Sequence, residues 1–301
     1  MGKNVISMSL WGDTPMYTVG AIRNAKMNPQ IFGPDWITRI YVGKDVPNSV
    51  CEILLSLPQT ECIPLPDEDP DWNGMFWRFW AISDPDVDVV IFRDTDSRPS
   101  TRDSAAVKEW MDSGKTIHIM RDHPYHTEPI MGGMWGCRAK VAFEKIKQEL
   151  PFADTMPEIT KAWLHKAIHD MQQGTSMFLK RYGSMEMLEG KTIKGVDQLF
   201  LRMVVYKIFQ DDCHINDAFP MYNAFSGVFD EQRYFATNAG TGIKKEMTTG
   251  FPSERGAFKE TPTKWHDFIG QQWDEEDVPN EEYAELLRQR DECVYMDWAK
   301  K

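Results

Sequence analysis

Short apolar runs alternate with longer amphipathic segments along the first 140 residues of the chain. The apolar runs have the length of β-strands, and the segments between them carry helix signals such as Thr14-Pro15, which predicts an N-cap followed by proline in the first turn. We expect strands at residues 4–10, 37–42, 61–65, 87–92 and 116–120, and helices at 15–26, 47–57, 75–82 and 101–113. Strands separated by such helices imply right-handed crossovers and a mostly parallel sheet with helices on both faces. The pattern predicts an α/β fold whose ligands bind beyond the carboxyl ends of the strands.

The pattern becomes more helical after residue 138. We expect helices at residues 139–150, 158–173 and 196–210, followed by a short strand at 213–216. Residues 220–270 are rich in glycine, threonine, proline and aromatic residues without periodicity, which predicts loops packed on the core. Asn280 is expected to cap a final helix with Glu281 and Glu282 in its first turn. We therefore expect one main domain over residues 1–275 and an acidic helical appendage over 276–301.

Composition and cysteine usage restrict the class of protein. Hydrophobic residues make up 42% and charged residues 27% of the chain, a balance that excludes a disordered or fibrous protein. The sequence contains no apolar run of the length that crosses a membrane. The five cysteines are scattered and never spaced as CxxC, which favours reduced thiols and argues against a cysteine metal site. Because the first residues also lack a signal-peptide pattern, we expect a cytoplasmic protein.

The formal net charge of −12 is unevenly distributed along the chain. Residues 271–301 hold ten acidic and four basic side chains, so this segment carries −6 and the first 270 residues carry the other −6. A chain with this charge is poorly suited to non-specific binding of nucleic acid or of anionic membranes. We therefore expect no stable binding of nucleic acid.

The main chemical signal is a pair of carboxylates at the end of the strand expected at 87–92. Asp94 and Asp96 follow this apolar run and are separated by one residue. Two carboxylates in this position form a site for a hard divalent cation, which prefers oxygen ligands and leaves coordination positions for phosphate oxygens. The alternative is that both residues only stabilise a turn, in which aspartate is common.

Several blocks of sequence around this pair resemble a family of glycosyltransferases that use nucleotide sugars. That family has the GT-A fold and occurs in large DNA viruses, including chlorella viruses, and in phages and bacteria. The central blocks are residues 94–98 (DTDSR), 106–115, 118–126 and 132–136 (GGMWG). More distant matches lie at 9–13 (SLWGD), 73–78 (NGMFWR), 197–201 and 268–271 (FIGQ). Together these blocks extend over most of the chain.

The resemblance implies a metal-dependent transferase with a nucleotide-binding half over about residues 1–100 and an acceptor half over about 101–275. Asp94 and Asp96 would hold Mn²⁺ or Mg²⁺ against the diphosphate of a nucleoside-diphosphate sugar, with UDP as the expected nucleotide. Such a cation offsets the charge that develops on the leaving nucleotide. The acceptor would be a hydroxyl group of a glycan or, in a phage, of a modified DNA base. A viral member would act in the host cytoplasm.

The resemblance also places residues around the donor. In the loop after the first strand, Asp13 would accept a hydrogen bond from the base or ribose, and Tyr17 would stack on the base. Arg78 stands in an otherwise apolar helix and needs a partner, which a donor phosphate or sugar hydroxyl would supply. The alternatives are that Tyr17 is a helix aromatic facing the core and that Arg78 forms a buried salt bridge to an acid such as Asp84.

Asp197, at the start of the helix expected at 196–210, would act near the acceptor. In an inverting enzyme it would deprotonate the acceptor hydroxyl. In a retaining enzyme Asp197 and Gln198 would line the reacting face. The alternative is an acid that only benefits from the helix dipole.

A second group of expected site residues lies between residues 121 and 133. By the resemblance Arg121, Asp122 and His123 would line the sugar pocket, and Gly132 and Gly133 would let the backbone approach the donor or acceptor. A glycine in a strand also marks a simple bulge. A zinc site at His123 and His126 is disfavoured, because Pro124 separates them and no further ligands are well spaced. A third ligand for the cation is left open among three residues: His214, Asp217 and His266.

Two other functions compete with sugar transfer. A haloacid-dehalogenase-type phosphatase also ends a strand in D-x-D and would use Asp94 as its nucleophile, but its motif normally follows the first strand. A non-catalytic protein that binds nucleotide sugars would have no chemical need for Asp94, Asp96, Arg78 and Asp197 together.

Overall fold

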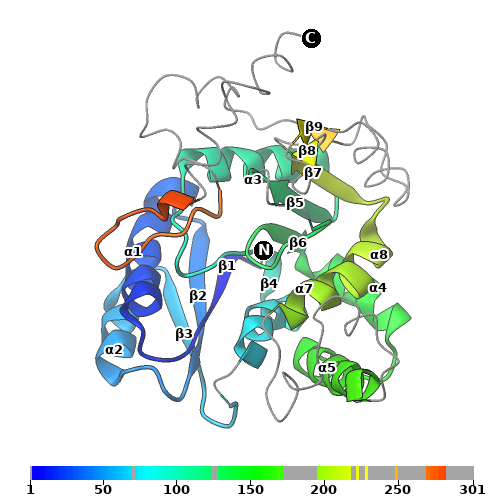
Figure 1. The fold of residues 1–301 in the computed structure, drawn as a ribbon, viewed down its shortest axis with the longest axis horizontal. Helices are drawn as coiled ribbons and strands as arrows, with labels where there is room; N and C mark the ends of the chain where they lie inside the picture. The colour runs from blue at the N-terminus through cyan, green and yellow to red at the C-terminus, as the bar shows by residue number, and fades with distance from the viewer. Residues whose placement is uncertain are drawn as a thin grey trace.

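Eight strands form one mixed, mostly parallel sheet in this protein (Figure 1). The computed structural model describes residues 2–69, 72–123, 126, 128–172, 195–217, 222–223, 228–229, 248–249 and 269–282. The sheet order is β10-β7-β5-β6-β4-β1-β2-β3, and β8 pairs with β9 in a separate two-stranded sheet. All pairings in the large sheet are parallel except those of β6 with β4 and β5. The predicted α/β fold with a mostly parallel sheet is therefore confirmed.

The strands lie close to their expected positions where the sequence predicts them. The strands are β1 (Lys3–Leu10), β2 (Trp36–Gly43), β3 (Thr60–Leu65), β4 (Val87–Phe92), β5 (Ile117–Arg121), β6 (Trp135–Arg138), β7 (Cys213–Asp217), β8 (Tyr222–Asn223), β9 (Val228–Phe229) and β10 (Thr248–Thr249). No strand was predicted at β6, which has only four residues and contains Gly136, a poor strand residue. Glycine is needed there because a Cβ would meet Ile91 and the backbone of Val90 at 2.8 Å.

The helices also follow the predicted order. They are α1 (Pro15–Phe32), α2 (Asn48–Ser56), the 3₁₀ helix η1 (Trp72–Ser83), α3 (Thr101–Ser113), α4 (Ala139–Glu149), α5 (Met156–Gln172), α7 (Val196–Phe200), the π-helix η3 (Leu201–Val205) and α8 (Tyr206–Phe209). The expected single helix at 196–210 is thus divided by a π-helical turn. The expectation that 220–270 forms loops is wrong at β8, β9 and β10, because two-residue strands leave no periodicity in a sequence. Most of 220–270, and the final helix beyond Glu282, lie outside the described residues.

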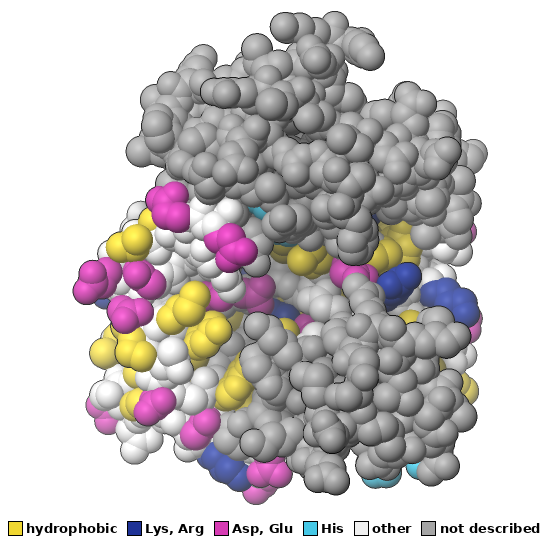
Figure 2. All heavy atoms as spheres, viewed as in Figure 1, with side chains coloured by type: hydrophobic (Ala, Val, Ile, Leu, Met, Phe, Trp, Pro, Cys, Tyr) yellow, Lys and Arg dark blue, Asp and Glu magenta, His cyan; other side chains and the backbone are white. Residues whose placement is uncertain are grey.

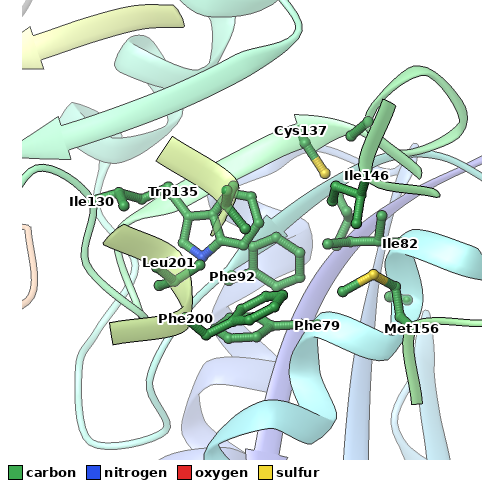
Figure 3. Packing of buried hydrophobic residues seen from close by; sticks show 14 of the residues in the cluster. Phe79, Ile82, Phe92, Ile130, Trp135, Cys137, Ile146, Met156, Phe200 and Leu201 are labelled. Carbon is green, nitrogen blue, oxygen red and sulfur yellow. The ribbon is translucent and has the colours of Figure 1, made fainter. Parts of the chain in front are cut away.

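Two hydrophobic layers cover the two faces of the sheet. One joins β1, β2 and β4 to α1, α2 and α3, and the other joins the sheet to η1, α4, α5 and α7. At the centre of the second layer the rings of Phe92 and Trp135 lie 4.3 Å apart, and Phe79 lies 5.2 Å from Phe92 (Figure 3). This packing fixes η1 against β4 and β6, and therefore fixes Arg78 relative to the end of β4.

Among the described helices, none has the length and apolar character needed to cross a membrane.

Candidate active site

A cavity of about 420 Å³ opens beyond the carboxyl ends of β1 and β4. Its walls come from the loop after β1, the start of α1, η1, the loop after β4, the turn before β6, α7 and the segment 269–282. The lining residues are Ser9, Leu10, Trp11, Gly12, Thr14, Tyr17, Met75, Arg78, Asp94, Thr95, Asp96, His126, Met131, Gly132, Gly133, Met134, Gln198, Gly270 and Gln272. The sheet edge that the sequence predicts for ligand binding therefore carries a cavity with charged groups in its wall.

Asp94 and Asp96 both line this cavity, and a buried arginine holds the first of them. Arg78 in η1 forms an ion pair from Nη1 to Asp94 Oδ1 and a second from Nη2 to Asp197 Oδ2 at 3.1 Å. The side chain of Asp94 is 44% exposed, whereas that of Asp197 is fully buried. The arginine therefore connects an acid in the cavity wall to an acid behind it.

The backbone around Arg78 is fixed by strand β1. Ser9 Oγ accepts a hydrogen bond from the Arg78 N–H at 2.9 Å, and Ser7 Oγ donates one to the Arg78 carbonyl at 2.7 Å. The alternative that Arg78 forms a buried salt bridge is borne out, but its partners are Asp94 and Asp197 rather than the suggested Asp84. Asp84 instead pairs with Arg39 at 2.6 Å. The expected contact of Arg78 with a donor phosphate or sugar hydroxyl stays a prediction.

Asp197 lies in the first turn of α7, behind the cavity wall. Burial raises the pKa of its carboxyl above the ordinary value, although the Arg78 guanidinium acts in the opposite direction. Among the described residues, Asp197 Oδ1 and Arg78 Nε have no hydrogen-bond partner. The next residue, Gln198, does line the cavity, and its Oε1 accepts a hydrogen bond from the Gly132 N–H at 3.3 Å.

Two consecutive glycines allow the chain to pass over this ion-pair network. A Cβ on Gly132 would lie 2.6 Å from Asp197 Oδ2 and 3.0 Å from Gln198 Nε2, besides overlapping Arg78. A Cβ on Gly133 would overlap Asp94 Oδ2. The expected close backbone approach at these glycines is therefore made to the carboxylates and the guanidinium of the protein itself.

Asp96 is buried, whereas the Asp94 side chain is partly exposed. Burial and the neighbouring charge of Asp94 raise the pKa of Asp96 to about 6. Its Oδ2 accepts a hydrogen bond from Gln272 Nε2 at 2.9 Å, which acts in the opposite direction. Two carboxylates that repel each other at the wall of one cavity fit a divalent cation, because a positive charge between them removes the repulsion.

The turn that carries the two aspartates is packed tightly on α1. Asn24 Nδ2 donates to the carbonyls of Asp94 and Thr95 at 3.3 and 3.2 Å. A Cβ on Gly20 would collide with the Thr95 carbonyl, so only glycine permits this approach. The alternative that Asp94 and Asp96 merely stabilise a turn is not favoured, since other side chains hold the turn while both carboxylates line the cavity.

Of the two residues expected to contact the nucleoside, Tyr17 lies in the cavity wall and Asp13 lies outside it. Tyr17 lines the cavity and is 38% exposed, so it does not face the core. Burial, followed by the charges of Asp96 and Asp94, raises the pKa of its hydroxyl, which keeps Tyr17 neutral. Asp13 is exposed and is not among the residues of the cavity wall. Its contact with a base or ribose stays a prediction.

The expected sugar-pocket residues 121–123 lie behind the wall rather than in it. Arg121 pairs with Asp217 at 2.8 Å, and Asp122 forms two contacts with Arg102 at 2.7 and 2.6 Å. The backbone N–H of Asp122 donates to His126 Nδ1, and the ring of His123 lies 5.5 Å from that of His126. Of this region, His126 is the side chain that lines the cavity.

Within the described part of the chain, no group of three or more histidine, cysteine or acidic side chains could hold a metal ion. His214 lies 3.7 Å from Glu109, Asp217 is paired with Arg121, and His266 lies outside the described residues. The protein ligands that fit a cation here are Asp94 and Asp96, a number that leaves positions for phosphate oxygens and water. Four of the five cysteines are described, and all four are free thiols.

No cavity role was predicted for Gln272 or His126 from the sequence, and Gln198 was expected at the reacting face only for a retaining enzyme. Gln272 is separated from Asp96 by 176 residues, so no local spacing could pair them. The block 268–271, which ends just before Gln272, was the one available signal. Figure 2 shows acidic side chains gathered at the edge of the molecule where Figure 1 draws the 269–282 segment beside α1.

Neither a protein-family model nor a curated protein sequence matches the chain. Partial similarity exists to solved structures. Residues 1–349 of S. aureus TarS align with 7% identity and a TM-score of 0.36, over 50% of this chain and 49% of that one. M. tuberculosis glucosyl-3-phosphoglycerate synthase aligns with 13% identity and a TM-score of 0.32, over 47% and 59%. Mouse xyloside xylosyltransferase 1 aligns with 11% identity and a TM-score of 0.35, over 72% and 85%. The chain thus spans about half the length of the first two.

Proposed function

We propose that this protein is a cation-dependent glycosyltransferase that moves a sugar from a nucleoside diphosphate to a hydroxyl acceptor. The observation that carries the proposal is the pair Asp94 and Asp96 at the wall of one cavity, with Arg78 ion-paired to Asp94 from behind. The resemblance of residues 94–98 and 132–136 to GT-A glycosyltransferases supports the same reaction, with UDP as the expected nucleotide.

The residues of the cavity wall would contact different parts of the substrates. Asp94 and Asp96 would hold Mn²⁺ or Mg²⁺, which when bound supplies positive charge to the leaving diphosphate. Tyr17 would stack on the base; its position in the cavity wall, near both aspartates, supports this role. Gln198 and His126 offer polar groups to the sugar or the acceptor.

Asp197 acts in this proposal through Arg78 rather than as the base that the resemblance implies for an inverting enzyme. Its carboxyl is fully buried, does not line the cavity and accepts the Arg78 Nη2 donor. The buried negative charge keeps the guanidinium in place beside Asp94. Asp197 is therefore a positioning residue, and Gln198 is the member of the pair that faces the reaction.

The test is thermal unfolding against UDP, GDP, CDP, ADP and dTDP, each with and without Mn²⁺. A ligand at about 100 times its Kd adds roughly 2.7 kcal/mol to the free energy of unfolding, which shifts the midpoint measurably. We expect stabilisation by one nucleotide only when Mn²⁺ is present. The variant Asp96→Asn should lose this response, whereas Asp112→Asn on the exposed side of α3 should keep it.

An unchanged Mn²⁺-dependent response in Asp96→Asn would refute the role of Asp96. No response to any nucleotide, together with stabilisation by Mg²⁺ and fluoroberyllate, would favour the phosphatase with Asp94 as nucleophile. Release of the nucleoside diphosphate from its sugar conjugate, followed in the same variants, separates an enzyme from a binding protein.

A further inference from the structure

The segment 269–282 contacts the aspartate turn through side chain and backbone. The N–H of Trp273 donates to the Asp96 carbonyl at 2.8 Å, and Ser97 forms an isolated bridge with Gln272. Asp277 in the same segment pairs with Arg23 of α1 at 2.6 Å and with Arg98 at 3.1 Å. These contacts hold Gln272 against the site from two sides.

The amide of Gln272 has one orientation that satisfies all its neighbours. Its Nε2 donates to Asp96 Oδ2 at 2.9 Å, and its Oε1 accepts from Asn280 Nδ2 at 3.4 Å. The reverse orientation would turn Oε1 toward the Asp96 carboxylate and place two donors opposite each other at Asn280. A carboxylate only accepts hydrogen bonds when ionised, so the reverse orientation is unfavourable at both ends.

Asn280 is oriented in turn by the backbone. Its Oδ1 accepts the Glu282 N–H at 3.0 Å, as expected for the cap of a helix, so its Nδ2 is turned toward Gln272. The Asn280 N–H also donates to the Gln272 carbonyl at 2.9 Å. The backbone N–H of Glu282 therefore determines which atom Gln272 presents to Asp96.

We propose that Glu282 N–H, Asn280, Gln272 and Asp96 form a hydrogen-bonded relay that positions Asp96 for the cation. Gln272 and Asn280 are positioning residues, and neither is a ligand. The relay occupies Asp96 Oδ2 and restrains rotation of the carboxylate, so that Oδ1 is left for the cation. The inference rests on the proposed cation site and adds the means by which the 269–282 segment controls it.

The experiment measures the Kd for Mn²⁺ directly, from the electron paramagnetic resonance signal of the free ion, with Mn²⁺ alone and then with the nucleotide found by thermal unfolding. Gln272→Met keeps the length of the side chain and removes the donor. Partners of ligating groups typically contribute 10- to 100-fold to metal affinity, so we expect the Kd to rise by about that factor. The unfolding midpoint without metal should stay close to wild type.

Asn280→Asp is the sharper variant, because it keeps the acceptor for the Glu282 N–H and removes the donor to Gln272. A carboxylate oxygen at this position, opposite Gln272 Oε1, would turn the Gln272 amide round and point its oxygen at Asp96. The added negative charge by itself would tighten binding of a cation. A higher Kd for Mn²⁺ in Asn280→Asp is therefore specific to the relay. This Kd can be measured even where Gln272→Met folds poorly.

Wild-type Kd values in both variants, with binding abolished in Asp96→Asn, would overturn the relay and leave the cation site intact. Equal Mn²⁺ binding by wild type and Asp96→Asn would overturn the proposed cation site and the relay with it. The two failures are thus distinguished by the Asp96→Asn protein.

Discussion

The buried ion pair between Arg78 and Asp197 makes a strong prediction about stability. Arg78→Met preserves most of the apolar contact of the side chain and leaves the Asp197 carboxyl without its cation. Because both side chains are almost completely buried, with 4% and 0% exposed, removal of one partner should cost about 3–5 kcal/mol of the free energy of unfolding. Most of that cost is the uncompensated charge of Asp197 rather than the lost attraction.

The double variant Arg78→Met/Asp197→Asn separates these contributions. It removes the buried charge and retains a neutral amide, whose imperfect hydrogen bonding costs about 1–3 kcal/mol. We therefore expect the double variant to be more stable than Arg78→Met alone, by roughly 2 kcal/mol on the same scale. Urea unfolding followed by circular dichroism measures all four proteins of the cycle, with Asp197→Asn as the other single variant.

The pH dependence of the free energy of unfolding tests the same ion pair of Arg78 and Asp197. Burial raises the pKa of Asp197, and loss of Arg78 removes the opposing influence. The folded Arg78→Met protein then binds more protons than the unfolded chain above about pH 4, so its stability falls as pH rises. We expect its deficit relative to wild type to be smaller at pH 5 than at pH 8. A double variant less stable than Arg78→Met, with no difference between the two pH values, would refute the reasoning.

Two further predictions concern Gly133 in the cavity wall and the ion pairs of Arg39. Gly133→Ala should displace the Asp94 carboxylate, because the added Cβ overlaps Oδ2, and should weaken Mn²⁺-dependent nucleotide binding about tenfold or more in a thermal-shift titration. An unchanged titration midpoint would contradict this close approach. Burial raises the pKa values of Glu61 and Asp84, but hydrogen bonds, including those from Arg39, outweigh burial and hold both below the ordinary range. Their contribution is therefore complete above about pH 4 and is lost as pH falls through the lowered values, so Arg39→Met should flatten the acid limb of the stability curve measured by urea unfolding between pH 6 and 3.

The sequence by itself determined the elements whose signals are local. The strand β4 lies at residues 87–92, as predicted, because five of its six residues are strand formers and turn signals flank the run, so no distant partner is needed to recognise it. The helix α3 lies at 101–113 for a similar reason, with Ser100 as its N-cap and Gly114 in the left-handed conformation at its end. Asp94 and Asp96 could be predicted as cation ligands because that prediction depends only on their position after one strand.

The tertiary structure decided the partners of these residues. Arg78 lies 119 residues before Asp197, and Gln272 lies 176 residues after Asp96. The crossovers of the sheet set which acid meets the arginine, and the sequence suggested Asp84 rather than Asp197 as the buried partner. The short strand β6 carries a glycine in place of a strand former, and the packing of Phe92 against Trp135 gives that segment its position in the sheet. Local pattern therefore located the carboxylates, and long-range packing determined the groups that hold them, because those contacts exist only after the chain has folded.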